Sequence, residues 1–206
     1  MNWSFIVISC TAVAGALIAY ERKKSDKKKA SAEEKYWSRE DYANTVRRKD
    51  ITHLDYIQIP LDELPFIETD DEELLEYYKT IRHLSGHKIL NLTGFTNTDL
   101  KEQYGVANLT ELSEYDENYT TLVNIITRWG ARLMALGHVT EAITVLEFGV
   151  SVGTDSSRNY YMLAEEYVKM ERPDEIDRLI DSAYNIRSIM RDSILAKLRE
   201  LRSYFV

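Results

Sequence analysis

The sequence predicts an all-α protein, in which an N-terminal transmembrane helix precedes a cytoplasmic helical-repeat domain of the α-α superhelix type. Three observations support this fold class: an apolar run at residues 3–20, amphipathic segments flanked by capping residues, and a repeat at an interval of 34 residues. We therefore divide the chain into a transmembrane anchor (1–21), a basic, charged linker (22–35), a helical N-terminal part of the soluble domain (36–118), and helical repeats with a C-terminal capping helix (119–206).

The apolar run Trp3–Tyr20 has the length and the flanks of a transmembrane helix. At about 1.5 Å per helical residue it spans close to the ~30 Å hydrocarbon core of a bilayer, and an aromatic residue stands at each end. A cluster of Lys and Arg within residues 22–29 follows the run, and none precedes it. The positive-inside rule then places the N-terminus outside and the C-terminal domain in the cytoplasm. We expect a single-pass protein of the cell membrane, which contacts the bilayer through residues 3–20.

Three other interpretations describe this run less well. A cleaved signal peptide would have a basic start, a shorter apolar stretch and a small-x-small exit. A lipobox is suggested by Val7–Cys10, but the apolar stretch continues for ten residues beyond Cys10. A buried core helix would carry a polar stripe, which this run lacks.

Charge and cysteine content exclude several functions for the remainder of the chain. Residues 30–206 hold 20 Lys and Arg against 32 Asp and Glu, a formal charge of −12. So acidic a surface repels nucleic acid, so that DNA or RNA is not expected as a partner. Cys10 is the single cysteine, which rules out a disulfide framework.

Capping and turn residues organise the part between residues 36 and 118. The box Thr69–Glu72 is expected to open a helix whose apolar residues recur at three- and four-residue steps. The other expected elements are a short helix over Ser38–Asp50, an extended segment over Ile51–Phe66 that packs onto the domain, the helix Glu72–Leu84, and a short helix over Asp99–Tyr104 that ends at Gly105.

The C-terminal half predicts consecutive amphipathic helices over Asp116–Ala135, Thr140–Val152, Arg158–Met170, Pro173–Ile186 and Arg191–Phe205. The first four form two helix–turn–helix units that align at an interval of 34 residues. Gly130 aligns with Ala164, and Gly149 with Ala183, so small residues recur where paired helices would cross. The last helix has Ile and Leu on one side and is expected to cap the array. Its apolar stripe could instead support a homodimer.

On these residues the chain resembles the tetratricopeptide repeat family. Residues 123–156 match best, through Gly130, Leu133, Gly137, Ala142, Leu146 and Gly149. Residues 157–190 match through Tyr160, Leu163, Ala164, Tyr167 and Ala183. The second unit departs from the family pattern at two positions, because Glu171 replaces the usual turn glycine and Ile176 the small residue. Thr154 and Ser188 stand where a proline commonly ends a repeat.

The resemblance implies that the first helix of each unit lines a concave surface that binds a protein or peptide. Carried over to this chain, the partner-binding residues would be Asn124, Thr127, Arg128, Met134, Arg158, Tyr161, Glu165 and Lys169, with Ala131 and Arg132 beside them. This set is mixed in charge and includes Met and Tyr, which suit adaptable contacts.

The sequence therefore predicts a membrane-tethered adaptor that binds a protein partner at the cytoplasmic face. An organelle outer-membrane receptor of the same layout is one alternative, and a membrane-bound enzyme with its site in residues 51–105 is another. No catalytic motif, cofactor motif or metal site is apparent; His83 and His87 are four residues apart, but Gly86 lies between them. A deep polar pocket beneath residues 91–99 would favour the enzyme, and a shallow groove along the first helices of the repeats would favour the adaptor.

Overall fold

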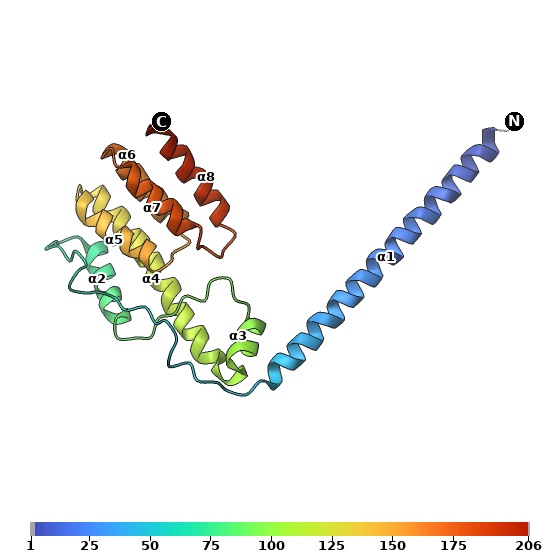
Figure 1. Cartoon of the computed structure of the whole chain (residues 1–206), viewed down its shortest axis with the longest axis horizontal. Coiled ribbons are helices and arrows are strands. Elements are labelled where there is room, and N and C mark those ends of the chain that lie inside the picture. Colours follow the sequence, from blue (N-terminus) through green and yellow to red (C-terminus); the bar gives the residue numbers. More distant parts are fainter. Residues whose placement is uncertain (1–2, 206) are drawn as a thin grey trace. The chain divides into compact units, whose positions relative to one another are not determined.

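The computed structural model describes the backbone of residues 3–205 and the side chains of residues 20–205. Within these limits every regular element is helical, which confirms the all-α class (Figure 1). The helices are α1 (Trp3–Thr45), α2 (Glu72–Leu84), α3 (Asn97–Tyr104), α4 (Leu109–Ala135), α5 (Val139–Ser151), α6 (Ser157–Lys169), α7 (Pro173–Ala183) and α8 (Arg191–Arg202), with 3₁₀ turns η1 (Val106–Asn108) and η2 (Ser203–Phe205).

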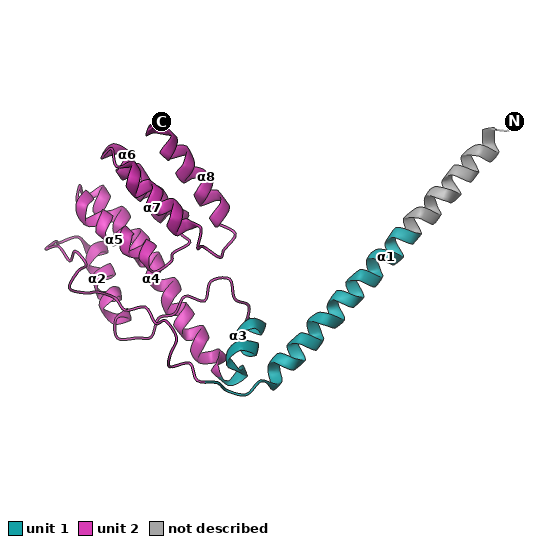
Figure 2. Ribbon diagram, viewed as in Figure 1, with its two compact units in different colours: residues 1–49, 97–107 teal, residues 50–96, 108–206 magenta. Residues whose placement is uncertain are grey.

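The chain divides into two compact units, which Figure 2 distinguishes by colour. Unit 1 contains residues 1–49 and 97–107, and unit 2 contains residues 50–96 and 108–206. Unit 1 consists of α1 and α3, whereas unit 2 holds the remaining α-helices. Each unit is therefore built from two separate stretches of the chain.

The predicted transmembrane helix is not supported. Among the residues that the structure describes, no helix is long and apolar enough to cross a membrane. A span needs about 20 predominantly apolar residues. The part of α1 with described side chains, residues 20–45, is instead almost entirely exposed and rich in Lys and Glu. The predicted run Trp3–Tyr20, apart from Tyr20, lies outside the residues with described side chains. The fold class is therefore corrected to all-α without a transmembrane helix among the described residues, and the membrane contact through residues 3–20 stays a prediction.

The separate short helix predicted over Ser38–Asp50 is also wrong, because α1 continues without a break through Ser38. No Gly or Pro occurs between residues 21 and 37 to end a helix, and Lys, Glu and Ala favour its continuation. The Ser38 hydroxyl donates to the Lys35 carbonyl 3.0 Å away, within the helix. The linker predicted over residues 22–35 is accordingly helical.

Ion pairs join α1 to α3 within unit 1. Arg39 binds Glu102 through its Nε at 2.9 Å and Asp99 through its Nη2 at 2.5 Å. On the next residue, the Glu40 carboxylate pairs with Lys101 and accepts a 2.7 Å hydrogen bond from the Thr98 hydroxyl. The carboxyl end of α1 is therefore held to α3 mainly by polar contacts.

Unit 2 is a stack of neighbouring helices. Contacts link α2 to α4, α4 to α5, α5 to α6 and α6 to α7, while α8 packs on both α6 and α7 (Figure 1). Helices α4 and α5 form the first predicted repeat unit, and α6 and α7 form the second. Their bounds differ from the predicted ones by at most three residues, apart from the start of α4, which lies at Leu109 rather than Asp116.

The two repeat units make the same turn between their helices. At the end of α4, Gly137 has a φ of 85°, and the His138 amide donates to the Leu133 carbonyl at 2.9 Å. Thirty-four residues later, at the end of α6, Glu171 has a φ of 55°. There the Arg172 amide donates to the Tyr167 carbonyl, also at 2.9 Å. This is the hydrogen bond of a helix C-terminus closed by a left-handed residue, so the sequence repeat is also a repeat of backbone geometry.

Small residues allow the helices of the first unit to cross closely. A Cβ atom added at Gly130 would lie 2.5 Å from Cδ2 of Leu146, closer than non-bonded carbons approach. At Gly149 it would lie 2.7 Å from Oδ1 of Asn159. Asn159 is fully buried, and its Nδ2 donates to the Leu146 carbonyl at 2.9 Å. The two glycines therefore bring α5 into direct contact with α4 and α6.

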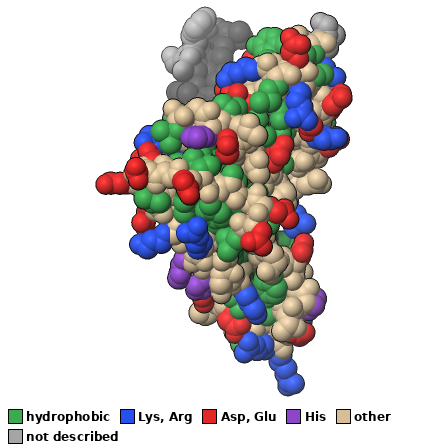
Figure 3. Space-filling model, turned by 90° about the vertical axis from the view of Figure 1, so that its left-hand side faces the viewer, with side chains coloured by type: hydrophobic (Ala, Val, Ile, Leu, Met, Phe, Trp, Pro, Cys, Tyr) green, Lys and Arg blue, Asp and Glu red, His purple; other side chains and the backbone are tan. Residues whose placement is uncertain are grey.

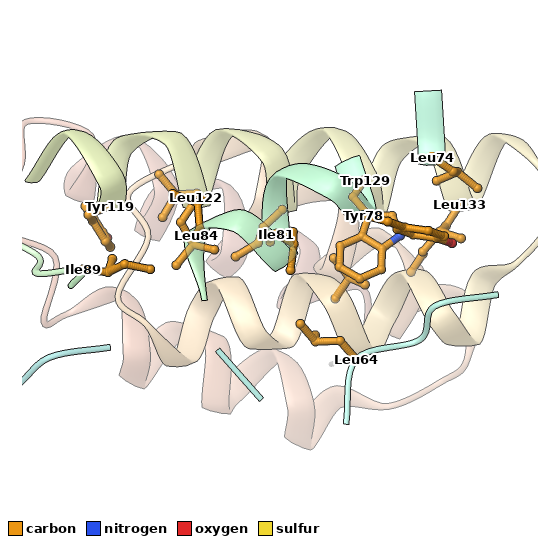
Figure 4. Packing of buried hydrophobic residues seen from close by; sticks show 14 residues of the cluster. Leu64, Leu74, Tyr78, Ile81, Leu84, Ile89, Tyr119, Leu122, Trp129 and Leu133 are labelled. Carbon is orange, nitrogen blue, oxygen red and sulfur yellow. The ribbon is translucent and has the colours of Figure 1, made fainter. Parts of the chain in front are cut away.

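The segment before α2 is ordered without regular secondary structure, as predicted for Ile51–Phe66. Its apolar side chains pack against the core formed by α2, α4 and α5; those that do so are Ile57, Ile59, Leu61, Leu64, Phe66 and Ile67. Figure 4 shows Tyr78 of α2 beside Trp129 of α4 in this core, with their ring centroids 5.2 Å apart. The segment thus covers one side of the α2–α4 pair.

Helix α2 has the predicted bounds, but its capping residue differs. The Asp71 carboxylate, not the Thr69 hydroxyl, accepts from the Leu74 amide at 3.0 Å. The Thr69 hydroxyl instead accepts from the Asp71 amide at 3.1 Å. A carboxylate at this position also interacts favourably with the helix dipole.

Helix α8 closes the other end of the stack. Its apolar residues are buried against α6 and α7; they are Ile194, Leu195, Leu198 and Leu201. A homodimer through this stripe would require these side chains to leave the core, so the structure favours the capping role that the sequence predicts.

Candidate functional site

A shallow groove runs along the first helices of the repeats. Its volume is about 220 Å³, and it lies entirely within unit 2. It is lined by Glu73 and Tyr77 from α2, Arg128, Ala131, Arg132 and Ala135 from α4, and Arg158 from α6. The two alanines have shorter side chains than the other lining residues. Two of the eight residues that the sequence predicts to bind a partner, Arg128 and Arg158, belong to this lining.

The arginines of the groove differ in their bonding. Arg132 pairs with Asp71, from Nε to Oδ2 at 3.1 Å, and with Glu73 at 3.3 Å. The hydrogen bond from Arg132 is the main reason that the pKa of Asp71 is lowered. Arg128 and Arg158 are exposed and make no ion pair with any residue of the described part of the chain. Three arginines therefore line the groove against one carboxylate, Glu73, with Asp71 beside it. Arg128 and Arg158 are the two arginines that pair with neither carboxylate.

The predicted binding residues divide between the groove and its surroundings. Arg128 and Arg158 line it, as do the neighbouring Ala131 and Arg132. Asn124, Glu165 and Lys169 are exposed but lie outside the lining, and Lys169 pairs with Glu166 at 2.6 Å.

Three of the predicted binding residues have structural contacts instead. Thr127 is buried, and its hydroxyl bonds to the Val123 carbonyl and to the Ser156 hydroxyl, at 2.9 and 3.2 Å. Met134 is half-buried and packs against the cores on both sides of it. The Tyr161 hydroxyl donates to the Ser193 carbonyl of α8 at 3.3 Å. The contacts of these three side chains therefore lie within the helix stack and not in the groove.

Sequence reasoning missed the contribution of α2 to the groove. Glu73 and Tyr77 lie one turn apart on this helix, which was predicted as a helix but not as part of the binding surface. The sequence held a usable signal, because Glu73 and Tyr77 are four residues apart and such residues share one helix face. Glu73 and Tyr77 directly precede Leu74 and Tyr78, which pack against α4, so this edge of α2 could have been predicted to border the groove.

A second, polar pocket of about 250 Å³ lies at the loop end of unit 2. It is lined by Asn91, Thr93, Gly153, Asp155, Ser182, Asn185, Ile186 and Arg187. Two of these residues belong to the segment 51–105, in which the alternative enzyme site was expected. The other six of its eight lining residues lie outside this segment, so the pocket matches only in part the deep polar pocket beneath residues 91–99 that was to favour the enzyme.

The surface charge elsewhere is mixed. On the face drawn in Figure 3, acidic and basic side chains are interspersed with hydrophobic ones. His83 and His87 lie with their ring centroids 4.5 Å apart, and His87 Nδ1 is 2.9 Å from the His83 carbonyl. Within the described residues, no group of three or more His, Cys, Asp or Glu side chains is placed to hold a metal ion.

Comparison with known proteins gives no match: no family model, no curated protein and no solved structure is significantly similar to this chain. The function must therefore be argued from the groove and the pocket themselves.

Proposed function

We propose that this protein is a binding adaptor, which holds an acidic segment of a protein partner in the groove along α2, α4 and α6. The single observation that carries this proposal is the pair of exposed arginines, Arg128 and Arg158, without ion-pair partners in the described part of the chain. Charge-assisted hydrogen bonds from arginine to carboxylate are among the strongest polar contacts available to a surface.

The form of the groove supports a peptide as the ligand. It is shallow and extends over three helices, whereas sites for small molecules are concave and enclose most of the ligand. Tyr77, half-buried at its edge, offers a flat apolar contact of the kind enriched in protein interfaces.

The charge of the whole chain adds selectivity to this arrangement. The protein carries a formal net charge of −8, so most of its surface repels an acidic partner. An acidic segment would then bind where arginines are locally in excess. Such binding should be steered electrostatically and should weaken as salt is added.

The test is a binding titration with fluorescently labelled peptides of equal length that are acidic, neutral or basic. We expect the full chain to bind the acidic peptides, and the double variant Arg128→Gln, Arg158→Gln to bind them at least about tenfold more weakly. The affinity should fall with rising salt in the wild-type protein and should depend less on salt in the variant.

The matched control is the variant Arg178→Gln, Arg191→Gln. These arginines are also exposed, but each pairs with a carboxylate, Glu175 and Asp192 respectively, and neither lines the groove. Equal loss of binding in both double variants would show a non-specific charge effect and contradict the proposal. If only the groove variant loses binding, crosslinking in cells with the same two variants would identify the natural partner.

A further inference from the structure

The polar pocket at the loop end of unit 2 is formed by three connections that are far apart in the sequence. Asn91 and Thr93 precede α3, Gly153 and Asp155 connect α5 to α6, and the third connection, from α7 to α8, contributes Asn185 and Arg187. Ile186, which is buried in the core of α6–α8, provides an apolar contact. Among the lining residues, only Ser182 belongs to a helix. The pocket shares no lining residue with the arginine groove and is therefore distinct from it.

Left-handed glycines hold these connections close together. Gly94 has a φ of 89°, and a Cβ atom there would lie 2.9 Å from Cβ of Arg187. Gly153 has a φ of 75°, and a Cβ atom there would lie 3.1 Å from Nδ2 of Asn91. Only glycine adopts this backbone conformation without strain. A larger residue at Gly94 would clash with Arg187, and one at Gly153 would press on Asn91. The two glycines therefore allow the connections to approach this closely.

A hydrogen-bond network fixes the wall of the pocket. The Asn91 amide donates to the Tyr119 hydroxyl at 2.8 Å, and this hydroxyl donates to the Gly153 carbonyl at 2.7 Å. The Asn91 Oδ1 atom accepts from the Thr93 amide at 3.0 Å. Because Asn91 bonds to Thr93 on its own connection and to Gly153 on the α5–α6 connection, this part of the wall is formed before any ligand arrives.

Two opposite charges line this pocket without neutralising each other. Neither Asp155 nor Arg187 makes an ion pair with any side chain in residues 20–205. The Arg187 guanidinium lies over the ring of Phe95, 5.5 Å from its centroid. Asp155 lies near Tyr160, whose pKa is raised to about 12 by burial and, after it, by the Asp155 charge. The two charges come from different connections, Asp155 from α5–α6 and Arg187 from α7–α8.

We propose that this pocket binds a small zwitterion of the α-amino-acid class, with its ammonium group on Asp155 and its carboxylate on Arg187. A zwitterion satisfies both charges with one molecule, whereas a simple anion or cation would leave one charge unpaired. Arginine matches the planar geometry of a carboxylate. The volume of about 250 Å³ lies below the roughly 300–1,000 Å³ of sites for drug-sized ligands, so it suits a smaller molecule.

Calorimetric titration of the full chain with a panel of zwitterions tests this proposal. The panel contains the standard L-α-amino acids, β-alanine, γ-aminobutyrate and the dipeptide glycylglycine. We expect the free L-α-amino acids to bind more tightly than β-alanine, γ-aminobutyrate and glycylglycine, and tighter binding of glycylglycine would contradict the proposal. For the best ligand, the N-acetyl derivative and the carboxamide should each bind at least about tenfold more weakly.

Two variants locate the contacts. Asp155→Asn should weaken binding about tenfold and remove the preference for the free amine over its N-acetyl derivative. Arg187→Gln should weaken binding about tenfold and remove the preference for the carboxylate over the carboxamide. The matched control is the exposed pair Asp192→Asn and Arg191→Gln, which lie outside the pocket and should leave the affinity unchanged.

The proposal is overturned if no member of the panel binds, or if binding is the same in the two pocket variants as in the wild-type protein. If a variant fails to fold, the N-acetyl and carboxamide derivatives still test each contact on the wild-type chain. The groove variant Arg128→Gln, Arg158→Gln should bind the zwitterion normally, which keeps this result separate from the test of the adaptor function.

Discussion

At the scale of single residues, the two repeat turns show how one backbone geometry is reached by different residues. Gly137 and Glu171 occupy equivalent positions, and both have positive φ. For glycine this costs nothing, whereas an L-residue in the left-handed region is strained by roughly 1–2 kcal/mol. The second turn therefore keeps the geometry of the first at a cost in stability.

Glu171→Gly should stabilise the protein. The strain at this position is removed, and the greater freedom of glycine in the unfolded chain offsets part of the gain. We expect the free energy of unfolding to rise by about 0.5–1 kcal/mol, which raises the melting temperature by about 1–4 °C. Thermal unfolding followed by circular dichroism measures this change.

Gly137→Ala is the control for this prediction. A Cβ atom at Gly137 would meet no other atom within 4 Å, so its cost is purely conformational. The alanine variant should be destabilised by about 1 kcal/mol. A lower melting temperature for Glu171→Gly would show that Glu171 has a contact that outweighs its backbone strain.

At the scale of elements, Asp71 joins α2 to α4. Its carboxylate caps α2 through the Leu74 amide and pairs with Arg132 of α4. These hydrogen bonds, chiefly the one from Arg132, lower the pKa of Asp71 in the folded state. The stability that results is present at pH values above the unfolded-state pKa of about 3.9 and is lost as the pH falls through the lower folded-state pKa.

Asp71→Asn should therefore lower the melting temperature at neutral pH and make it less sensitive to acid. Asparagine is also a good helix cap, so the substitution removes mainly the charge. The difference between variant and wild type should shrink as the pH falls below 4, in thermal unfolding measured from pH 7 to pH 3.

The exposed residue Asp192, changed to asparagine, provides the control, because it caps no helix in the described part of the chain and pairs only with its neighbour Arg191. Identical pH profiles for Asp71→Asn and the wild-type protein would refute the role of the Asp71 charge.

At the scale of the whole molecule, the stack in unit 2 depends on its two ends. Each helix contacts its neighbours in the stack, so stability passes along it from interface to interface. Helix α8 covers the last interface with fully buried side chains, among them Leu198. The opposite end is covered by α2 and by the segment before it.

Leu198→Ala should destabilise the entire stack and not only α8. Loss of a buried leucine costs about 2–5 kcal/mol. In a background with Trp3 and Trp37 changed to Phe, the fluorescence of the buried Trp129 reports on the distant core of α2 and α4. We expect its unfolding midpoint in urea to fall together with that of circular dichroism.

The exposed substitution Ala196→Ser on the same helix serves as the control and should shift neither midpoint appreciably. If Leu198→Ala moved the circular dichroism midpoint while Trp129 fluorescence stayed unchanged, the two ends of the stack would unfold independently.

The sequence predicted much of the fold because the relevant signals are local. Local signals placed the helices of unit 2 to within a few residues, except at the start of α4. These signals are the apolar spacing, Pro173 at the first position of α7 and the capping residues before α2. The 34-residue interval predicted that the two turns would be equivalent, as Gly137 and Glu171 are.

Hydropathy at the N-terminus predicted a fold class with a transmembrane helix, which is wrong for the described residues, because no helix among them is long and apolar enough to cross a membrane. The apolar run is the start of α1, which continues to Thr45 through a charged stretch. Continuous helix-forming residues extended this helix past Ser38, where a cap was expected.

The sequence by itself determined the helices and two of the groove arginines, Arg128 and Arg158, since a residue's position on a helix face follows from its spacing. Only the tertiary structure decided which polar side chains are buried, as Thr127 is, and which loops meet to form the polar pocket. The physical reason is range: helix formation depends on contacts four residues apart, whereas Asn91, Asp155 and Arg187 meet only because the stacked helices bring their loops together.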